Sequence, residues 1–97
     1  MKIEYEYDEN KNKQNIDKHK ISFEYAYLVY ESDSKITMTK YSNNEERLND
    51  IAMIEIDNKV LLLVYIIRSN KIRVISLRTA SKAERKLYYE EFSKETK

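Results

Sequence analysis

The 97-residue chain contains no glycine, and this constrains its fold more than any other feature of the sequence. Glycine adopts positive φ without steric cost, so tight turns in this chain have to use residues that carry a side chain. Asparagine tolerates such conformations best, and we expect asparagines to occupy the positive-φ turn positions. The same absence excludes the glycine-rich phosphate loops of nucleotide-binding enzymes.

The rest of the composition narrows the chemistry further. The length is that of one domain, which we expect to span residues 1–97. There is no cysteine, which excludes disulfides and thiolate nucleophiles, and the single histidine makes a transition-metal site improbable. We therefore expect neither a metal nor a cofactor. No apolar run reaches 18 residues and the N-terminal segment is acidic, which predicts a soluble, cytoplasmic protein without a membrane partner.

The near-neutral charge of +1 is unevenly distributed along the chain. Residues 68–87 contain seven basic residues and one acid, whereas residues 21–60 contain eight acids and four bases. Such asymmetry indicates a polyanion or an acidic partner. A solvated charged face is the alternative that charge alone leaves open, and the more frequent one.

The N-terminal third shows one strand pattern and two helix patterns. Residues 2–7 alternate apolar and charged side chains, which predicts a short edge strand. Asp8 is placed to cap a helix over Glu9–His19. Ser22 is placed to cap a second helix, whose apolar residues are Phe23, Ala26, Tyr27 and Tyr30.

The remaining sequence predicts four strands and a final helix. The expected strands are Ile36–Thr39, Leu48–Ile56, Val60–Ile67 and Ile72–Arg78. A polar loop is expected over Tyr41–Glu46, and two-residue hairpin turns at Asp57-Asn58 and Ser69-Asn70. Ser81 and Glu84 form a capping box for the last helix, with Ala83, Leu87, Tyr88 and Phe92 available to pack.

Together these elements predict an α+β fold. Its sheet should be an antiparallel meander, with two N-terminal helices and one C-terminal helix against one face. The run LLLVYII should be the central strand, buried on both faces.

Two arginines of the last strand are candidates for binding phosphate. Arginine offers a planar fork of donors that matches phosphate oxygens. Strict alternation sends Arg73 and Arg78 to opposite faces, unless a bulge or the strand end redirects Arg78. One of them, with Arg47 and Arg85, could line a phosphate-binding groove.

His19 is the one side chain whose ordinary pKa lies near neutrality, so it is a candidate general acid or base. It shares a helix face with Lys11 and Asn15, which precede it at intervals of four residues. The alternative is that His19 only interacts favourably with the dipole at the helix C-terminus. The nine tyrosines could stack on bases, but each taken singly is more often a packing residue.

The order and spacing of several short motifs resemble the BrnT family of type II toxins. The motifs are Tyr7-Asp8, Lys11, Asn15, Lys18-His19, Ile21-Ser22-Phe23, Ala26, Glu45-Glu46-Arg47 and the segment IRVISLRTASKAERKLYYE. The resemblance extends from about Tyr5 to Glu90. It implies a RelE-like fold and a ribonuclease toxin that inhibits translation by cutting RNA. It also implies a BrnA-like antitoxin partner with a ribbon-helix-helix domain. The toxin would contact DNA only through this partner. A homodimer and a heterotetramer with the antitoxin are both compatible with it.

Three positions depart from the family pattern. The family has tryptophan where this chain has Tyr7, glycine where it has Lys20, and a small residue where it has Leu77. At Lys20, either the helix ends differently or the lysine adopts a costly left-handed conformation. The geometry around His19 depends on which of these holds.

RNA cleavage of this kind needs no metal, because the 2′-hydroxyl of RNA is itself the nucleophile. It needs a base for that proton, cations for the charge that develops on the phosphate, and an acid for the leaving 5′-oxygen. By resemblance, we expect the catalytic residues to be Lys18, His19, Glu46, Arg73, Arg78 and Tyr88. His19 or Glu46 would be the base, and Tyr88 a proton donor or a stacking surface. We expect the RNA-binding residues to be Tyr7, Lys11, Arg47 and Arg85.

Two other classes of function remain open at this point. One is a non-catalytic module that binds an antitoxin or nucleic acid, which the missing tryptophan and glycine would favour. The other is a structural or interaction domain that does not contact nucleic acid.

Overall fold

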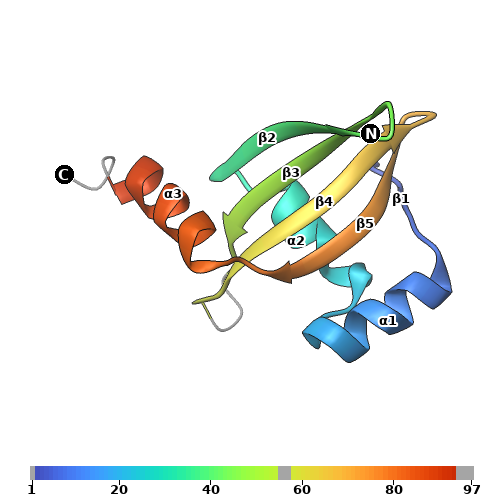
Figure 1. Ribbon diagram of the computed structural model, residues 1–97, viewed down its shortest axis with the longest axis horizontal. Helices are drawn as coiled ribbons and strands as arrows, with labels where there is room; N and C mark the ends of the chain where they lie inside the picture. The colour runs from blue at the N-terminus through green and yellow to red at the C-terminus, as the bar shows by residue number, and fades with distance from the viewer. Residues whose placement is uncertain (1, 55–57, 94–97) are drawn as a thin grey trace.

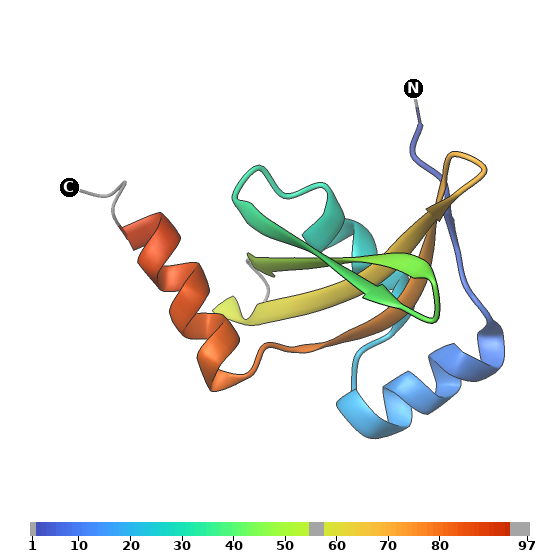
Figure 2. The ribbon, with the colours of Figure 1, turned by 45° about the horizontal axis from the view of Figure 1, so that its top comes forward.

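The computed structural model describes residues 2–54 and 58–93. In chain order the elements are β1 (Tyr5–Glu6), α1 (Glu9–His19), the 3-10 helix η1 (Phe23–Tyr25), α2 (Ala26–Tyr30), β2 (Lys35–Ser42), β3 (Glu45–Met53), β4 (Val60–Arg68), β5 (Lys71–Thr79) and α3 (Lys82–Ser93). The α+β prediction is confirmed. Figure 1 shows α2 behind the sheet and α3 at its left end, and Figure 2 shows α1 beside the β5 edge.

The sheet has the strand order β1-β5-β4-β3-β2. The predicted antiparallel pairing of the last three strands is confirmed, since β3 pairs with β4 and β4 with β5 in that sense. The prediction of a purely antiparallel sheet is wrong, because β1 is parallel to β5, with Tyr5 opposite Ile72. Alternation predicts a strand but not the direction in which it joins a sheet edge. The expected strand over residues 2–7 is regular only at Tyr5–Glu6.

Two hairpins are closed by residues with positive φ, as the absence of glycine requires. Asn43 and Asn44 have φ of 52° and 60°, and Ser69 and Asn70 have φ of 51° and 63°. Positive φ at both central positions is typical of the type I′ turn, whose twist matches that of the flanking strands. The polar loop expected over Tyr41–Glu46 is therefore wrong, because the strands extend to the Asn43-Asn44 turn. The expected Asp57-Asn58 turn falls partly on Asp57, which lies outside the described residues; Asn58 has φ of 50°.

The first predicted helix is confirmed at both ends. The Asp8 carboxylate accepts hydrogen bonds from the backbone N–H groups of Asn10 (2.8 Å) and Lys11 (3.1 Å), and so caps α1. The second predicted helix is short and begins as a 3-10 turn, which the Ser22 hydroxyl caps by accepting from the Glu24 N–H (3.3 Å).

The 3-10 turn changes which residues of this segment reach the core. Three residues per turn align Phe23 with Ala26, and Val29 follows on the same side. All three are buried, whereas Tyr27 is 47% exposed. The i, i+3, i+4, i+7 pattern of a core-facing α-helix grouped Tyr27 with Phe23 and Ala26, and for Tyr27 that grouping is wrong because the segment begins as a 3-10 turn.

Apolar side chains form one cluster on each face of the sheet. The first lies between η1, α2 and the sheet and contains Phe23, Ala26, Val29, Leu63 and Leu77 among others. The second lies under α3 and contains Ile51, Val60, Leu62, Ala80 and Tyr88. The helices thus lie on both faces, not on one as predicted. Of the expected packing residues of α3, Tyr88 and Phe92 pack, while Ala83 and Leu87 are exposed.

Candidate functional site

A β-bulge in β5 determines where the two candidate arginines point. Ser76 pairs with Val64 and Val74 pairs with Tyr65, so Ile75 is the extra residue. After the bulge, Leu77 joins Val74 in the cluster under η1 and α2. Alternation along a regular strand predicted opposite faces for Arg73 and Arg78, with a bulge as the exception. The bulge is present, so the prediction of opposite faces is wrong.

The strand register places both arginines on the face that carries α3. Arg73 is opposite Ile66, and Arg78 is opposite Leu62, a residue of the cluster under α3. Ile66 and Leu62 are four residues apart on β4, so they share a face. In Figure 1 this face points to the viewer, since α2 lies behind the sheet.

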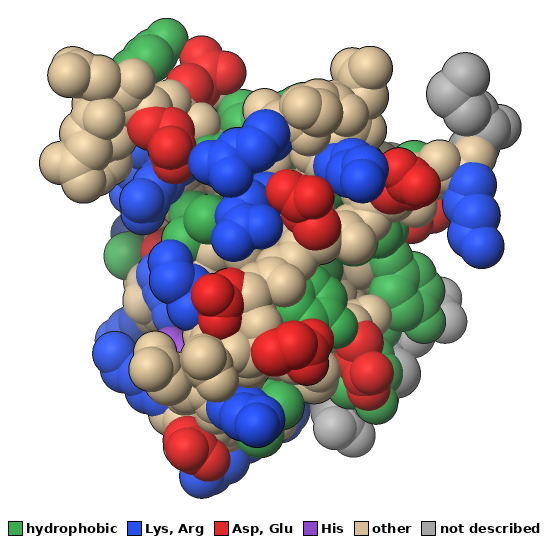
Figure 3. All heavy atoms as spheres, turned by 90° about the vertical axis from the view of Figure 1, so that its right-hand side faces the viewer, with side chains coloured by type: hydrophobic (Ala, Val, Ile, Leu, Met, Phe, Trp, Pro, Cys, Tyr) green, Lys and Arg blue, Asp and Glu red, His purple; other side chains and the backbone are tan. Residues whose placement is uncertain are grey.

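We call this surface the open face, because α3 covers it only at one end. The basic residues that the register places on it are Lys40, Arg47, Arg68, Lys71, Arg73 and Arg78. The acids that it places there are Glu6 and Glu45. Figure 3 shows that Lys and Arg are interspersed with Asp and Glu at one end of the molecule, so positive charge is not uniform over the whole surface. On the open face the basic residues outnumber the acids, and four of them, Arg47, Lys71, Arg73 and Arg78, each have a carboxylate partner.

A second feature is a cleft between α1 and β5, which we call the α1–β5 cleft. Its volume is about 270 Å³. It is lined by Lys11, Gln14, Asn15, Lys18 and His19 from one side of α1 and by Ile75 and Ser76 at the bulge. The five helix residues follow the i, i+3, i+4, i+7, i+8 spacing of one helix face. Three predicted site residues, Lys11, Lys18 and His19, therefore come together here.

Asparagine side chains hold α1 in place beside β5. Asn15 donates to the carbonyls of Leu77 (2.7 Å) and Ile21 (2.9 Å) and accepts from the Leu77 N–H (3.4 Å). Asn12 accepts from the N–H of Phe23 (2.8 Å). Both asparagines are buried, and their amides satisfy backbone groups that would otherwise lack partners. The polar face of α1 is thus both its attachment to the sheet and a wall of the cleft.

His19 is half-buried in this setting. Burial lowers its pKa below the usual 6.5, and the positive charges of Lys18 and Arg78 lower it further. The imidazole is accordingly neutral at neutral pH and able to accept a proton. Ser76 lines the cleft, and the register places it on the open face two residues before Arg78, so the cleft and the open face adjoin.

Arg78 is fixed by Glu84 at the start of α3. Its two terminal nitrogens donate to the two Glu84 carboxylate oxygens at 2.8 and 2.9 Å, and one also donates to the Thr79 carbonyl at 3.2 Å. Three of the five N–H donors of the guanidinium are thus used, which leaves two for a phosphate. The hydrogen bonds from Arg78 lower the pKa of Glu84 to about 2.

The same carboxylate completes the capping box that the sequence predicted. Glu84 accepts from the Ser81 N–H (2.7 Å), and the Ser81 hydroxyl accepts from the Glu84 N–H (3.2 Å). Arg85, in the same turn, donates to the Ala80 carbonyl at 2.9 Å. The expected RNA-binding residue Arg85 therefore lies at the corner where β5 leads into α3.

Arg73 and Arg47 occupy other parts of the open face. Arg73 lies 3.5 Å from a carboxylate oxygen of Glu6, and the Arg47 Nε lies 3.7 Å from one of Glu45. Their partners Ile66 and Leu62 are four residues apart on β4, a strand that rises about 3.3 Å per residue, so roughly 13 Å separates the Cα atoms of Arg73 and Arg78. Different carboxylates, those of Glu6 and Glu84, hold the two guanidinium groups, so the arginines are suited to contact different phosphates of one RNA strand.

Three predicted site residues lie away from the cleft. Tyr88 is buried under α3 and donates to the Ser34 carbonyl (3.1 Å). Glu46 accepts from the Tyr41 hydroxyl (3.0 Å) at the β2–β3 turn, beside the end of β4 that is far from Arg78. Tyr7 packs edge-on against Phe23, with ring centroids 5.4 Å apart. The structure does not bring these three together with His19.

Several cleft residues were not predicted. Gln14 lies on the helix face that Lys11, Asn15 and His19 share, so the helical spacing could have predicted its position in the cleft. Ile75 and Ser76 depend on the bulge, for which the strand sequence offers no local signal. The Arg78–Glu84 pair is separated by six residues across a turn, and the sequence indicated only capping for Glu84.

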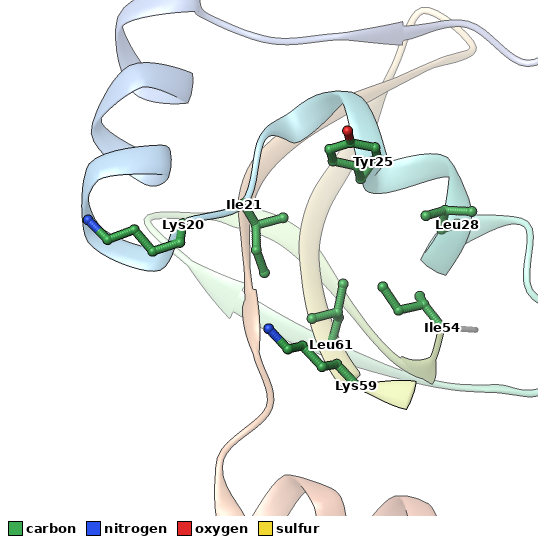
Figure 4. A pocket seen from close by; sticks show the side chains of 7 residues that line it. All are labelled: Lys20, Ile21, Tyr25, Leu28, Ile54, Lys59 and Leu61. Carbon is green, nitrogen blue, oxygen red and sulfur yellow. The ribbon is translucent and has the colours of Figure 1, made fainter. Parts of the chain in front are cut away.

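A further pocket, shown in Figure 4, is of a different character. It has a volume of about 240 Å³ and is lined mainly by apolar residues, Ile21, Leu28, Ile54 and Leu61, with Tyr25, Lys20 and Lys59. None of the predicted catalytic or RNA-binding residues lines it. The α1–β5 cleft is the better candidate for catalysis, because it contains the histidine, whose ordinary pKa lies near neutrality, beside a lysine.

Across residues 2–54 and 58–93, no group of three or more His, Cys, Asp or Glu side chains is arranged to hold a metal ion. No helix in that same part of the chain is long and apolar enough to cross a membrane.

Comparison with known proteins identifies the family. No curated protein matches the chain. A family model described as "Ribonuclease toxin, BrnT, of type II toxin-antitoxin system" matches residues 7–84, which include α1, the whole sheet after β1, and the Arg78–Glu84 pair. The chain belongs to the BrnT family of ribonuclease toxins.

Proposed function

We propose that the chain is a metal-independent endoribonuclease that inhibits translation, with His19 as its general base and Arg78 as its principal phosphate ligand. The observation on which this rests is that His19 and Lys18 line one cleft together with Ser76, which lies two residues before an arginine, Arg78, that Glu84 holds in place. Family membership supports ribonuclease activity and an antitoxin partner. Metal independence is the part of the proposal that the chemistry of RNA supports, because the 2′-hydroxyl can attack the adjacent phosphorus without a metal-bound nucleophile.

The cleavage step uses the residues of the cleft in defined roles. His19 takes the proton of the 2′-hydroxyl, the 2′-oxygen bonds to phosphorus, and the bond from phosphorus to the 5′-oxygen breaks. The products are a 2′,3′-cyclic phosphate and a 5′-hydroxyl. The two uncommitted N–H donors of Arg78 stabilise the charge that develops on the phosphate oxygens. The Lys18 ammonium, on the cleft wall, is the donor available to the leaving 5′-oxygen.

The other expected residues take more distant roles in this proposal. Arg73, Arg47 and Arg85 bind phosphates on either side of the scissile one, and Lys11 does so at the cleft rim. Glu46 is a weaker candidate for the base than His19, because it lies at the far end of the sheet. Tyr88 packs α3 against the sheet and Tyr7 packs against Phe23. In this proposal both residues support RNA cleavage only by stabilising the fold.

The partner in this proposal is a BrnA-like antitoxin with a ribbon-helix-helix domain. The antitoxin would cover the basic open face with an acidic or apolar surface. RNA could then not reach the open face, and an acidic surface would place opposite charges across the interface. DNA would be contacted only through the antitoxin, and the toxin would form either a homodimer by itself or a heterotetramer with the antitoxin. A RelE-like fold and a cytoplasmic site of action complete the proposal.

Cleavage of RNA by purified protein in EDTA tests the proposal. The wild-type chain should produce fragments that end in 2′,3′-cyclic phosphate, and its expression without a partner should arrest growth. His19→Ala should lose cleavage, whereas Lys13→Ala, on α1 but outside the cleft, should retain it. Intact RNA after incubation with folded wild-type protein, together with normal growth, would favour a non-catalytic binding module instead.

A further inference from the structure

We infer that the α1–β5 cleft also reads one base of the RNA beside the scissile phosphate, through Gln14 and Ser76, and that it prefers adenine. The inference rests on the proposed function for the identity of its ligand. It concerns a part of the cleft that the cleavage step above does not use, namely the segment between Lys11 and Lys18 on α1 and the bulge on β5.

The polar groups of the cleft differ in whether they are already engaged. The Asn15 carboxamide is committed on both sides, to Leu77 and to Ile21, so it cannot read a ligand. The Gln14 carboxamide and the Ser76 hydroxyl also line the cleft, and neither forms a hydrogen bond with another group in the described part of the chain. A donor, an acceptor and a hydroxyl are thus presented to whatever enters.

The bulge supplies an apolar surface in the same place. Ile75 is the extra residue of β5, and it lines the cleft beside Ser76 instead of entering either apolar cluster. A bulge redirects a side chain in this way without breaking the sheet. A flat aromatic base packed on Ile75 would present its edge to Gln14 and Ser76, because all three residues line the same cleft.

The hydrogen-bonding pattern of Gln14 selects among the bases. A carboxamide presents one donor next to one acceptor, and adenine presents the complement on its Hoogsteen edge, an N6 amino group beside N7. The inference therefore places the Hoogsteen edge of adenine against Gln14, because the pyrimidines have no ring nitrogen on the corresponding edge and cannot make both hydrogen bonds. Guanine offers two acceptors on its Hoogsteen edge, which suits arginine or lysine better than glutamine.

The position of these groups places the base next to the chemistry. Ser76 shares the open face with Arg78, two residues later on β5. Gln14 precedes Lys18 by one helical turn on the same face of α1. A nucleotide whose phosphate lies between Arg78 and Lys18 therefore has its base, or that of its neighbour, over Ile75.

Cleavage of a pool of short RNAs with randomised sequence tests the inference, with sequencing of the new ends. Wild-type protein should prefer adenine at one position next to the cut by about tenfold, the discrimination expected of one bidentate pair. Gln14→Leu, which keeps the size of the side chain but removes its polar groups, should reduce that preference to about twofold or less. Ser76→Ala should weaken it, and Lys13→Ala should keep the wild-type preference.

A binding measurement separates this inference from the proposed function. Adenosine monophosphate should shift the NMR signals of Ile75, Ser76 and His19 more strongly than uridine monophosphate, and Gln14→Leu should remove the difference. If RNA stays intact but this adenine-dependent shift is seen, the proposed function fails and the base-reading site stands. If cleavage occurs with the same base preference in wild type, Gln14→Leu and Ser76→Ala, the base-reading site is wrong and the ribonuclease stands.

Discussion

Lys20 ends α1 in the left-handed conformation, with φ 63° and ψ 27°. Its N–H donates to the Ile16 carbonyl (2.8 Å), and its ammonium donates to the Asp17 carbonyl (2.8 Å). The helix therefore ends as it would with glycine at this position, and of the two alternatives posed by the sequence, the left-handed lysine is the one observed. The geometry of His19, one residue earlier, is retained at the cost of backbone strain.

This strain predicts that Lys20→Gly stabilises the protein. A residue with a Cβ costs about 1 kcal/mol or more in this conformation, and glycine removes that cost. Lys13→Gly, inside the regular part of α1, should destabilise by roughly 0.5 to 1 kcal/mol. Urea unfolding of both variants measures the two effects. A Lys20→Gly protein that is less stable than wild type would mean that the bond from the Lys20 ammonium to Asp17 outweighs the strain.

His19 gives a second prediction at this scale, and as the only histidine it has a single imidazole signal. Its pKa should lie below 6.5, because burial and the charges of Lys18 and Arg78 oppose protonation. Cleavage by a neutral base should rise with pH through that same pKa. Lys18→Gln removes one opposing charge and should move the midpoint of both curves to higher pH. NMR titration in the two proteins measures the shift, and a His19 pKa above 6.5 in wild type would contradict the proposed neutral base.

At the scale of elements, β2 is joined to β3 by a buried charge as well as by its backbone ladder. Asp50 on β3 is fully buried and accepts from the Lys35 ammonium (2.7 Å) and the Thr37 hydroxyl (2.7 Å), both on β2. The same ammonium donates to the Tyr30 carbonyl (2.8 Å) at the end of α2. Burial and the Asp50 charge together raise the pKa of the nearby Tyr65 hydroxyl. One carboxylate thus fixes α2, β2 and β3 relative to one another.

Asp50→Asn should therefore be strongly destabilising. It leaves the Lys35 ammonium, whose side chain is 23% exposed, without its carboxylate, and breaking a buried pair costs roughly 3 to 5 kcal/mol. Asp33→Asn, an equivalent change at an exposed position, should alter stability by no more than about 0.5 kcal/mol. Denaturant unfolding compares the two. Equal stability of both variants would show that the pair does not hold β2 in place.

Local patterns predicted most elements, but not the contacts that position them. Periodicity and capping residues predicted α1, the three-stranded hairpin series and the capping box of α3, because these depend on neighbours in sequence. The Asn15 bonds to Leu77 join residues 62 apart, and the bulge at Ile75 follows from pairing with β4. Neither leaves a local signal. The shared face of Arg73 and Arg78, and hence the form of the site, could not be obtained from alternation alone.

At the scale of the whole molecule, the candidate site joins opposite ends of the chain. α1 contributes Lys18 and His19, β5 contributes Arg78 after its bulge, and α3 contributes Glu84, which holds Arg78 in place. The open face extends from Arg78 toward Arg73 and Arg47, and in the proposed function RNA bound along it would reach the α1–β5 cleft. Catalysis should depend most on the arginine beside His19 and less on those further along the face.

The measurement that tests this account most directly is the rate of RNA cleavage by Arg78→Ala and Arg73→Ala, in EDTA, with circular dichroism and urea unfolding to establish that both are folded. Arg78→Ala should lower the rate by about 10² to 10³, the effect of losing one preorganised donor to the developing charge. Arg73→Ala should lower it much less, because the Cα atom of Arg73 is roughly 13 Å from that of Arg78 along the sheet, away from the cleft. Arg78→Lys, which keeps the charge without the fork, should still cleave far more slowly than wild type while RNA binding falls less. A well-folded Arg78→Ala protein that cleaves at the wild-type rate would contradict the assignment and move the site toward Arg73.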